Sequence, residues 1–514
     1  MTANVECILE RLPGHTHSQT MVKHLRSVFR RHLVLLSAAM ALSAVLSGCA
    51  EPEIAAAVDA VRPNIVVVVT DDQGYTDLGT HGIASDVQTP NIDQLAADGI
   101  LMTSGYSTAP QCTPSRAALV TGRYQQKFGV DDNTFTPMPR EEITLAQRLQ
   151  DAGYQTGMVG KWHLEPNVKS VVVDPSSLSP HEQVSYFPDQ RGFDDVYVGY
   201  LNDWRTNFDL AGNDVPVSGR ENLDYRLDVA TEAALTFIDR HQDEPFFLYL
   251  SYYAPHVPLE APQEYLSRFP DVVDERRRYA LAMMAAVDDG VGEIRERLQQ
   301  HGLTDNTLVF FISDNGAPLG IYKLDLPVDD DAGEWDGSLN EPWVGEKGML
   351  SEGGVRVPYI VSWPARLPSG QVYNQAVSTL DVAPTSLAAA HLAVPAALDG
   401  VDLVPHLLST VESENMDTSL SERSLYWRFW SQAAVRKGRW KYLLAGEREF
   451  LFDMQANHEN ENLIGQYPDI AMALHNELGD WSASLYRPGL PTRAFNNKEQ
   501  AWFDFYFAAE SLAD

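Results

Sequence analysis

A single cysteine lies at the start of a sequence that is typical of an α-helix. Cys112 is followed by Thr113 and Pro114, which suit an N-cap and the first helical position, and Gly122 can end the helix. We therefore expect Cys112 just outside a helix N-terminus, where free N–H groups and the helix dipole lower a thiol's pKa or stabilise an attacking oxyanion. The alternative is that Cys112 is a small apolar residue packed at the helix start.

Two polar pairs follow two strongly apolar stretches. Asp71 and Asp72 come directly after a run of β-branched residues, and Asp314 and Asn315 come after a second apolar run. Carboxylate and amide oxygens together suit a hard divalent cation, either Ca²⁺ or Mg²⁺. Each residue taken alone could instead cap a helix or form a turn, and Asp-Asn-Gly is a typical turn sequence.

Lysine and histidine side chains follow the ends of two further predicted strands. Lys161 and His163 come after the strand expected to end at residue 160, and His256 follows the strand expected over 246–252. Because the carboxyl ends of such strands meet at one edge of a sheet, we expect His256 to lie near the two polar pairs. Each could equally be an ordinary surface or loop residue.

Three segments together resemble the motifs of the type I formylglycine-dependent sulfatases, in the polysaccharide sulfatase branch of the alkaline phosphatase superfamily. They are Cys112-Thr113-Pro114-Ser115-Arg116, Gly160-Lys161-Trp162-His163 and Lys347-Gly348-Met349-Leu350. The resemblance implies that a formylglycine-generating maturation enzyme oxidises the cysteine, and that the hydrated aldehyde is the nucleophile. It also implies a sulfuric ester hydrolase.

The resemblance assigns ligands and roles to the residues already singled out. Its metal is Ca²⁺, although spacing alone does not exclude Mg²⁺, and the ligands would be Asp71, Asp72, Cys112, Asp314 and Asn315. Lys161 and Lys347 would bind sulfate oxygens, and Arg116 would orient the formylglycine. His163 would hydrogen-bond the formylglycine hydroxyl, and His256 would protonate the leaving alcohol.

The expected substrate is a sulfated polysaccharide or oligosaccharide, such as the marine algal galactan carrageenan, or ulvan. Trp204 and Arg205, in an expected loop at 202–205, are candidate sugar-binding residues, and ordinary packing is their alternative explanation. The stretch 323–342 is expected to form a long loop near the active face or an insertion with no role. Two rival functions are a phosphate or phosphonate ester hydrolase of the same superfold, and a non-catalytic glycan-binding lipoprotein.

The charge balance and the N-terminal segment indicate partners and location. The net charge of −33 leaves no excess of cations with which to bind nucleic acid. Basic residues, a short apolar stretch and a lipobox ending in Cys49 are typical of a bacterial lipoprotein signal. We expect Cys49 to be lipidated and the protein to be anchored in the outer membrane or at the cell surface, with the periplasm as the alternative location. An ordinary secretory signal or a membrane anchor is the alternative explanation of the segment, and Met21 is a candidate start of translation.

These elements must be positioned by an α/β fold, because apolar strands alternate with amphipathic helices. We predict a large mixed, mostly parallel sheet sandwiched by helices, and a smaller C-terminal antiparallel sheet with a helix. Ligands of such sheets bind beyond the carboxyl ends of the strands, which is where the polar pairs lie. The expected organisation is a signal region, a tether, a catalytic domain and a C-terminal α+β subdomain, at 1–49, 50–61, 62–400 and 401–514.

Overall fold

The computed structural model describes residues 62–320, 335–412, 420, 422–456 and 459–508. The predicted signal region, the tether and Cys49 lie outside these residues. Residues Arg62–Asp514 form one compact unit. The domain boundary at residue 400 stays a prediction. Among the described helices, none has both the length and the apolar character that crossing a bilayer requires.

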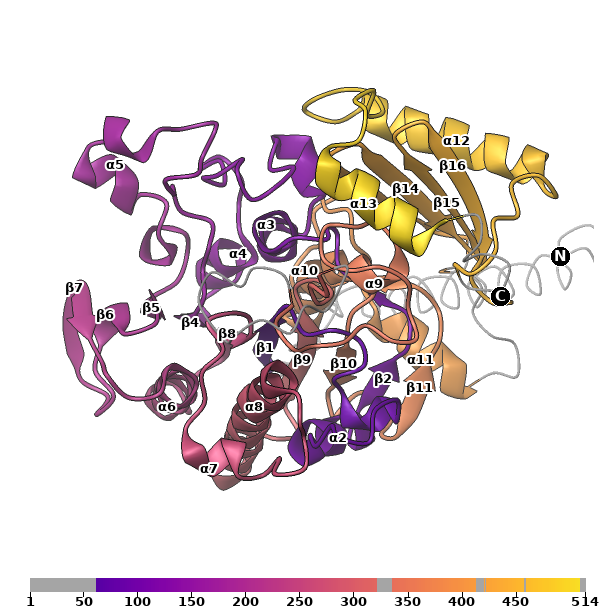
Figure 1. The fold of residues 1–514 in the computed structure, drawn as a ribbon. Helices are drawn as coiled ribbons and strands as arrows, with labels where there is room; N and C mark the ends of the chain where they lie inside the picture. The colour runs from indigo at the N-terminus through magenta and orange to yellow at the C-terminus, as the bar shows by residue number, and fades with distance from the viewer. Residues whose placement is uncertain (1–61, 321–334, 413–419, 421, 457–458, 509–514) are drawn as a thin grey trace, which may run out of the picture. The chain divides into compact units, whose positions relative to one another are not determined.

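A ten-stranded sheet forms the centre of this unit (Figure 1), in the order β11-β2-β10-β9-β1-β8-β4-β5-β6-β7. The five strands from β9 to β5 are mutually parallel, and antiparallel pairings occur towards both edges. This confirms the predicted mixed, mostly parallel sheet. The strands are β1 (Asn64–Asp71), β2 (Ile100–Met102), β4 (Gln155–Gly160), β5 (Asp195–Tyr200), β6 (Asp203–Phe208), β7 (Asp214–Glu221), β8 (Phe246–Pro255), β9 (Thr307–Ser313), β10 (Tyr359–Ser362) and β11 (Gln371–Tyr373).

Helices cover both faces of the large sheet, and the alternation along β1 shows why. Val66 and Val68 pack into one core, whereas Ile65, Val67 and Val69 pack into a second core on the opposite face. A strand with both faces buried is therefore apolar at every position. The first core contains residues of α2 (Pro90–Ala97), α6 (Arg226–Arg240) and α8 (Glu275–Gln300), and the second contains residues of α3 (Cys112–Thr121), α4 (Leu145–Asp151) and α10 (Val382–Ala389).

A four-stranded antiparallel sheet follows in sequence, as predicted, with each strand paired to the next. One of its faces packs against α12 (Pro468–Ala483), and the other packs against residues 349–355 and α13 (Asn497–Tyr506). The sequence did not predict α13. The strands are β13 (Ser424–Phe429), β14 (Gln432–Lys437), β15 (Trp440–Ala445) and β16 (Arg448–Asp453).

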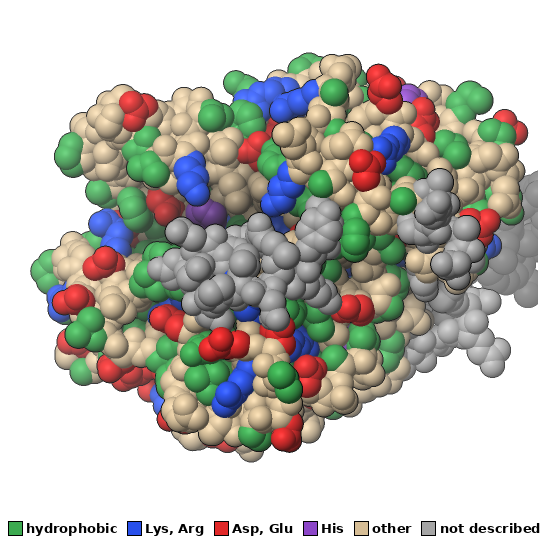
Figure 2. All heavy atoms as spheres, in the orientation of Figure 1, with side chains coloured by type: hydrophobic (Ala, Val, Ile, Leu, Met, Phe, Trp, Pro, Cys, Tyr) green, Lys and Arg blue, Asp and Glu red, His purple; other side chains and the backbone are tan. Residues whose placement is uncertain are grey.

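Strand β6 corrects one prediction, and the remaining elements are short. The segment 202–205, expected to be a loop, enters β6, whose even-numbered side chains from 204 to 208 are buried. The short elements are β3 (Gly105–Tyr106), β12 (Val377–Ser378), α5 (Pro180–Val184), α7 (Gln263–Leu266), α9 (Glu352–Val355) and α11 (Val404–Glu412). On the part of the visible face that is not grey, Figure 2 shows Asp and Glu side chains scattered among Lys and Arg.

Candidate active site

Cys112 is the first residue of α3, and Gln111 is the N-cap. The cysteine therefore lies inside the helix and not just outside it, as the sequence had suggested. Its side chain is buried, and burial raises the pKa of the Cys112 thiol, so the prediction of a lowered thiol pKa is wrong. The thiol nevertheless faces polar atoms: Sγ lies 3.4 Å from Oδ1 of Asp71 and 3.9 Å from Oδ1 of Asp72.

The acidic residues meet because β1 and β9 are parallel neighbours, with Thr70 opposite Ser313. Ligand atoms of Asp71, Asp72, Cys112 and Asp314 all lie within 4.8 Å of one another. Asp72 adopts a left-handed backbone conformation with φ of 64°, and its N–H donates to Oδ1 of Asp314 at 3.1 Å. The structure thus brings together side chains that are more than 240 positions apart in sequence.

Three basic side chains offset the negative charge of these carboxylates. Nζ of Lys161 lies 2.6 Å from Oδ2 of Asp71, and Nζ of Lys347 lies 2.6 Å from Oδ2 of Asp72. Nη2 of Arg116 lies 2.7 Å from Oδ2 of Asp314. Burial opposes ionisation of Asp71, but Lys161 and the other nearby cations hold its pKa well below the usual value, whereas burial raises the pKa of Asp314 to about 6.

His256 also faces the acidic cluster. Its Nε2 lies 3.7 Å from Oδ2 of Asp72, and its Nδ1 lies 2.6 Å from the carbonyl oxygen of Val257. Since that carbonyl can only accept, Nδ1 carries a proton and Nε2 is the atom directed at the site. Arg226 fixes this loop by donating to the carbonyl oxygens of His256 and Pro258, at 3.4 and 2.7 Å. Burial lowers the pKa of His256.

A sharp turn after β4 positions Lys161 and His163. Gly160 has φ of 90°, and a Cβ there would lie 1.9 Å from the carbonyl oxygen of Ser251, so only glycine fits. The Lys161 N–H donates to the same oxygen at 2.8 Å. His163 has φ of 60°, its carbonyl oxygen accepts from Oγ1 of Thr113 at 3.3 Å, and its Nδ1 is buried without a hydrogen-bond partner.

The donor set fits a hard divalent cation. Three carboxylates and the residue-112 side chain converge, and Asn315 donates from Nδ2 to Oδ1 of Asp72 at 2.6 Å. The other amide atom, Oδ1 of Asn315, is buried and has no hydrogen-bond partner, which is costly unless a further group binds it. A cation with oxygen ligands would satisfy this atom together with the carboxylates.

A pocket of about 240 Å³ opens above the acidic cluster. Asp72, His256 and Lys347 form one part of its wall. Trp430, Lys498 and Trp502 form another part, and the rings of Trp430 and Trp502 are stacked with centroids 6.3 Å apart. Trp430 lies in the turn between β13 and β14, and Lys498 and Trp502 lie in α13. No local motif marks these three residues in the sequence.

Trp204 and Arg205 are not among the residues that line the pocket above the acidic cluster. Trp204 is only 1% exposed and packs against Tyr197, with ring centroids 5.2 Å apart, so its indole has no face available to a sugar. Arg205 forms two hydrogen bonds with Asp189, at 2.9 and 2.8 Å, and lies over the ring of Phe187. Packing, the alternative explanation, agrees with the burial of Trp204, and an ion pair with Asp189 holds Arg205.

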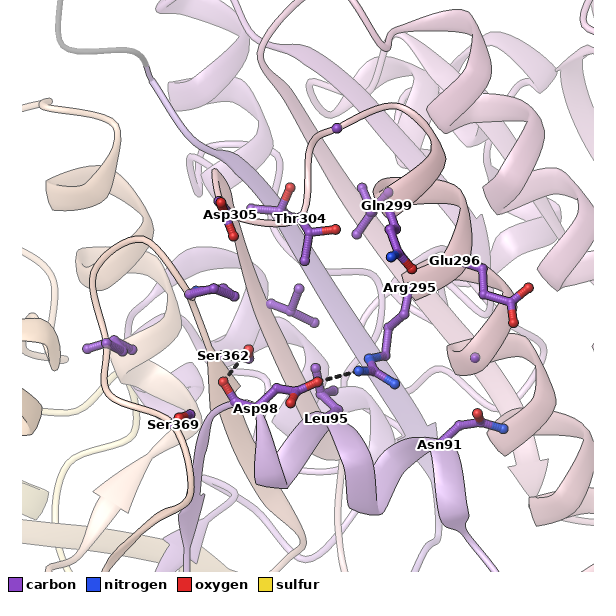
Figure 3. Close-up of a pocket in the computed structure, with 17 residues that line it drawn as sticks. Asn91, Leu95, Asp98, Arg295, Glu296, Gln299, Thr304, Asp305, Ser362 and Ser369 are labelled. Carbon is purple, nitrogen blue, oxygen red and sulfur yellow. Dashed lines mark hydrogen bonds and ion pairs between the residues drawn. The ribbon is translucent and has the colours of Figure 1, made fainter.

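A larger pocket, of about 860 Å³, lies at the opposite end of β9 (Figure 3). It is lined by ends of α2 and α8, where Arg295 pairs with Asp98, and Ser362 Oγ donates to the Asp98 carbonyl at 3.4 Å. None of its described lining residues has a buried side-chain polar atom without a partner. Size alone therefore does not make it the functional site.

Comparisons with known proteins agree with this geometry. The model of the Sulfatase family matches residues 63–392, and the model described as N-sulphoglucosamine sulphohydrolase, C-terminal, matches residues 342–483. The N-acetylgalactosamine-6-sulfatase of Canis lupus familiaris is 34% identical over 413 residues, which are 74% of this chain and 71% of that protein. The uncharacterized sulfatase YdeN of Escherichia coli (strain K12) is 32% identical over 69% of this chain and 67% of its own length.

Solved structures show the same fold. Ps i-CgsB, solved in complex with k-i-k-neocarrahexaose, superposes with a TM-score of 0.69 at 29% identity, over 88% of this chain and 99% of that chain. The phosphonate monoester hydrolase of Agrobacterium radiobacter, at 21% identity and a TM-score of 0.60, covers 81% of this chain and 95% of that chain, and shares the fold. With the family model covering more than half of its length, the chain belongs to the sulfatase family of the alkaline phosphatase superfamily and is a sulfuric ester hydrolase.

Proposed function

We propose that this sulfatase hydrolyses sulfate esters on an extracellular sulfated polysaccharide or oligosaccharide, such as carrageenan or ulvan. It would use formylglycine made from Cys112 by a maturation enzyme, together with Ca²⁺. The observation that carries the proposal is the convergence of residue 112 with three carboxylates within 4.8 Å, beneath a pocket whose wall includes Lys347. A purely structural cysteine has no need of such a neighbourhood.

Two absent groups would supply part of the chemistry. Formylglycine would provide the attacking hydroxyl, and the divalent cation, held by Asp71, Asp72, Asp314, Asn315 and residue 112, would provide positive charge beside it. In the structure, Lys161 and Lys347 pair with two of these carboxylates. With the carboxylates bound to a cation, both ammonium groups would be available to sulfate oxygens.

The other side chains have roles that follow from their positions. Nε2 of His256 is directed at the cluster, so a protonated His256 can give its proton to the leaving alcohol oxygen. Arg116 holds Asp314 and also donates to Ser251, which fixes the start of α3 and thereby residue 112. The unpartnered Nδ1 of His163 is available to hydrogen-bond a hydroxyl of the formylglycine.

A carbohydrate substrate is supported by the pocket and by the similar proteins. The pocket combines lysine side chains with indole rings, and sugars bind to proteins through aromatic faces and polar groups. One similar structure was solved in complex with a neocarrahexaose, and the name of one relative includes N-acetylgalactosamine-6. Secretion as a lipoprotein through Cys49, to the outer membrane, the cell surface or the periplasm, would bring the enzyme to such a substrate.

The nucleophile is tested by replacing Cys112 and by weighing the intact protein. Enzyme produced with a maturation enzyme should carry a residue about 18 Da lighter than cysteine at position 112, because an aldehyde replaces the thiol. Cys112→Ala should lose at least about 1,000-fold in kcat on 4-nitrophenyl sulfate, since no other described side chain can replace the nucleophile. Unchanged hydrolysis by this variant would refute the assignment.

The type of ester and the substrate need separate assays. Matched aryl sulfate and aryl phosphate distinguish a sulfatase from a phosphate or phosphonate ester hydrolase, and we expect the sulfate to react faster. A panel of carrageenan and ulvan oligosaccharides, with the desulfated position read by NMR, tests the carbohydrate proposal. Binding of these oligosaccharides without any sulfate release would favour the non-catalytic alternative.

A further inference from the structure

Asp336 lies in the same pocket and has an unusual environment for a carboxylate. Its side chain is buried, with 2% of the residue exposed. Oδ1 accepts a hydrogen bond from the Ser338 N–H at 3.2 Å, but Oδ2 is buried and has no hydrogen-bond partner in the structure. Leaving a buried polar atom without a hydrogen bond is unfavourable, so the position of this atom needs an explanation.

The fold provides no such reason. Asp77, a buried acid of the same region, shows what a structural carboxylate looks like here: Arg277 lies 2.7 Å from its Oδ1, and Ser338 Oγ donates to its Oδ2 at 2.6 Å. Asp336 has no cation within ion-pair distance among the described residues. It neither caps a helix nor joins two strands.

The position of Asp336 does provide a reason. It lines the pocket together with His256 and Lys347, which face the acidic cluster, and with Trp430, whose half-buried ring is suited to a sugar ring. A sugar that presents its sulfate ester to Lys347 carries hydroxyl groups one or two carbon atoms away. These hydroxyls must enter the same 240 Å³ and need hydrogen-bond partners there.

We propose that Asp336 binds a hydroxyl group of the sugar ring that carries the sulfate ester, and that this hydrogen bond selects the sugar. The inference rests on the proposed carbohydrate function and adds the residue that recognises the sugar. Burial also raises the pKa of Asp336 well above its usual value. The unpartnered Oδ2 of Asp336 can accept a hydrogen bond from a sugar hydroxyl.

The test compares two substrates in wild type, Asp336→Ala and Ser338→Ala. The first substrate is 4-nitrophenyl sulfate, which has no hydroxyl groups. The second is the best sugar found for wild type among galactose 6-sulfate, N-acetylgalactosamine 6-sulfate, carrageenan oligosaccharides and ulvan oligosaccharides. We expect Asp336→Ala to lower kcat/KM for the sugar at least tenfold more than for the aryl sulfate, because only the sugar loses a partner.

Ser338→Ala is the matched control. It removes a hydroxyl from the same loop, where Ser338 bonds Asp77 and the Gly74 N–H, and should affect both substrates by the same factor. If Asp336→Ala does not fold, Asp336→Asn serves instead, with an expected differential loss of at least threefold. Deoxy analogues of the sugar provide a second readout: deleting the recognised hydroxyl should slow wild type but not the Asp336 variant.

The outcomes separate this inference from the function on which it rests. Sugar desulfation by wild type, with equal losses for both substrates in the Asp336 variant, would overturn the role of Asp336 and leave the carbohydrate function intact. Hydrolysis of 4-nitrophenyl sulfate by wild type without desulfation of any sugar in the panel would overturn both. A differential loss confined to the Asp336 variant supports the inference.

Discussion

At the scale of single residues, the site is a balance of buried charges. Asp71, Asp72 and Asp314 lie close enough together to repel one another strongly, and Lys161, Lys347 and Arg116 offset that repulsion. The same lysines are the expected sulfate ligands. Under the proposed function, the carboxylates would need another cation before the lysines could bind the substrate, which would link metal binding to both stability and activity.

Removal of the metal tests this link. Treatment of the matured enzyme with EDTA should abolish sulfatase activity and lower the Tm by several degrees, because an ion at 100 times its Kd stabilises the native state by about 2.7 kcal/mol. Adding Ca²⁺ back should restore both quantities, and Mg²⁺ should restore them less well. Asp71→Asn is the control, because a protein without the site should show no Tm change with EDTA. An unchanged Tm in treated wild type would contradict the proposed ion site.

At the scale of elements, sequence patterns predicted the parts whose signals are local. The apolar runs became β1, β8 and β9, and parallel pairing then brought the polar residues that follow β1 and β9 to one edge. The pocket wall formed by Trp430 and Lys498 could not be predicted in this way. These residues join the site only because the second sheet packs against the segment that follows Lys347, and no spacing in the sequence encodes that contact.

The prediction of a loop at 202–205 was wrong for a related reason. The segment reads as a polar turn, but Trp204 is the first of three alternating buried positions in β6. The alternation of every second side chain from 204 to 208 indicates a half-buried strand, but the aromatic and basic side chains suggested a binding loop instead. A tryptophan followed by an arginine is compatible with a sugar site, and equally with a core residue next to an ion pair. Only the burial of the two side chains decides between these possibilities.

Helix α2 begins with a cap that another helix supplies. Its own N-cap, Thr89, makes no side-chain cap hydrogen bond. Asp288 in the middle of α8 instead accepts from the N–H groups of Asn91 and Ile92, at 2.9 and 2.8 Å. These bonds satisfy two of the free N–H groups at the helix start and fasten α2 to α8.

This cap predicts a specific pH dependence of stability. Burial raises the pKa of Asp288 to about 6, from about 3.8 in the unfolded chain. The native state thus binds the proton more tightly, and the stability contributed by this group falls as the pH rises through that window. Between pH 5 and 7.5, wild type should lose on the order of 1 kcal/mol relative to Asp288→Asn, as Tm values of both proteins would show. Parallel Tm profiles would contradict the assignment.

At the scale of the whole molecule, buried charges join the four-stranded sheet to the segment that follows Lys347. Nζ of Lys441, on β15, lies 2.9 Å from Oε1 of Glu352 and 2.8 Å from Oε1 of Glu459. Oε2 of Glu352 accepts from the Tyr106 hydroxyl at 2.6 Å and from Arg356 at 3.1 Å. Glu352 and Arg356 thus hold together the segment that follows Lys347, and Lys441 fastens the second sheet to that segment.

Replacement of Lys441 by methionine should therefore impair both stability and activity. The change leaves two buried carboxylates without their shared cation, and breaking a buried ion pair in this way costs about 3–5 kcal/mol. The urea midpoint should fall accordingly, and kcat should fall as the segment 347–358 loosens. Lys437→Met on β14 is the matched control, since Lys437 is 40% exposed and pairs with Glu477 at 3.1 Å, and a surface pair contributes at most about 1 kcal/mol. If the two variants unfold at the same urea concentration, the charge cluster does not fasten the second sheet to that segment, and the second sheet acts on the site only through the residues that line its pocket.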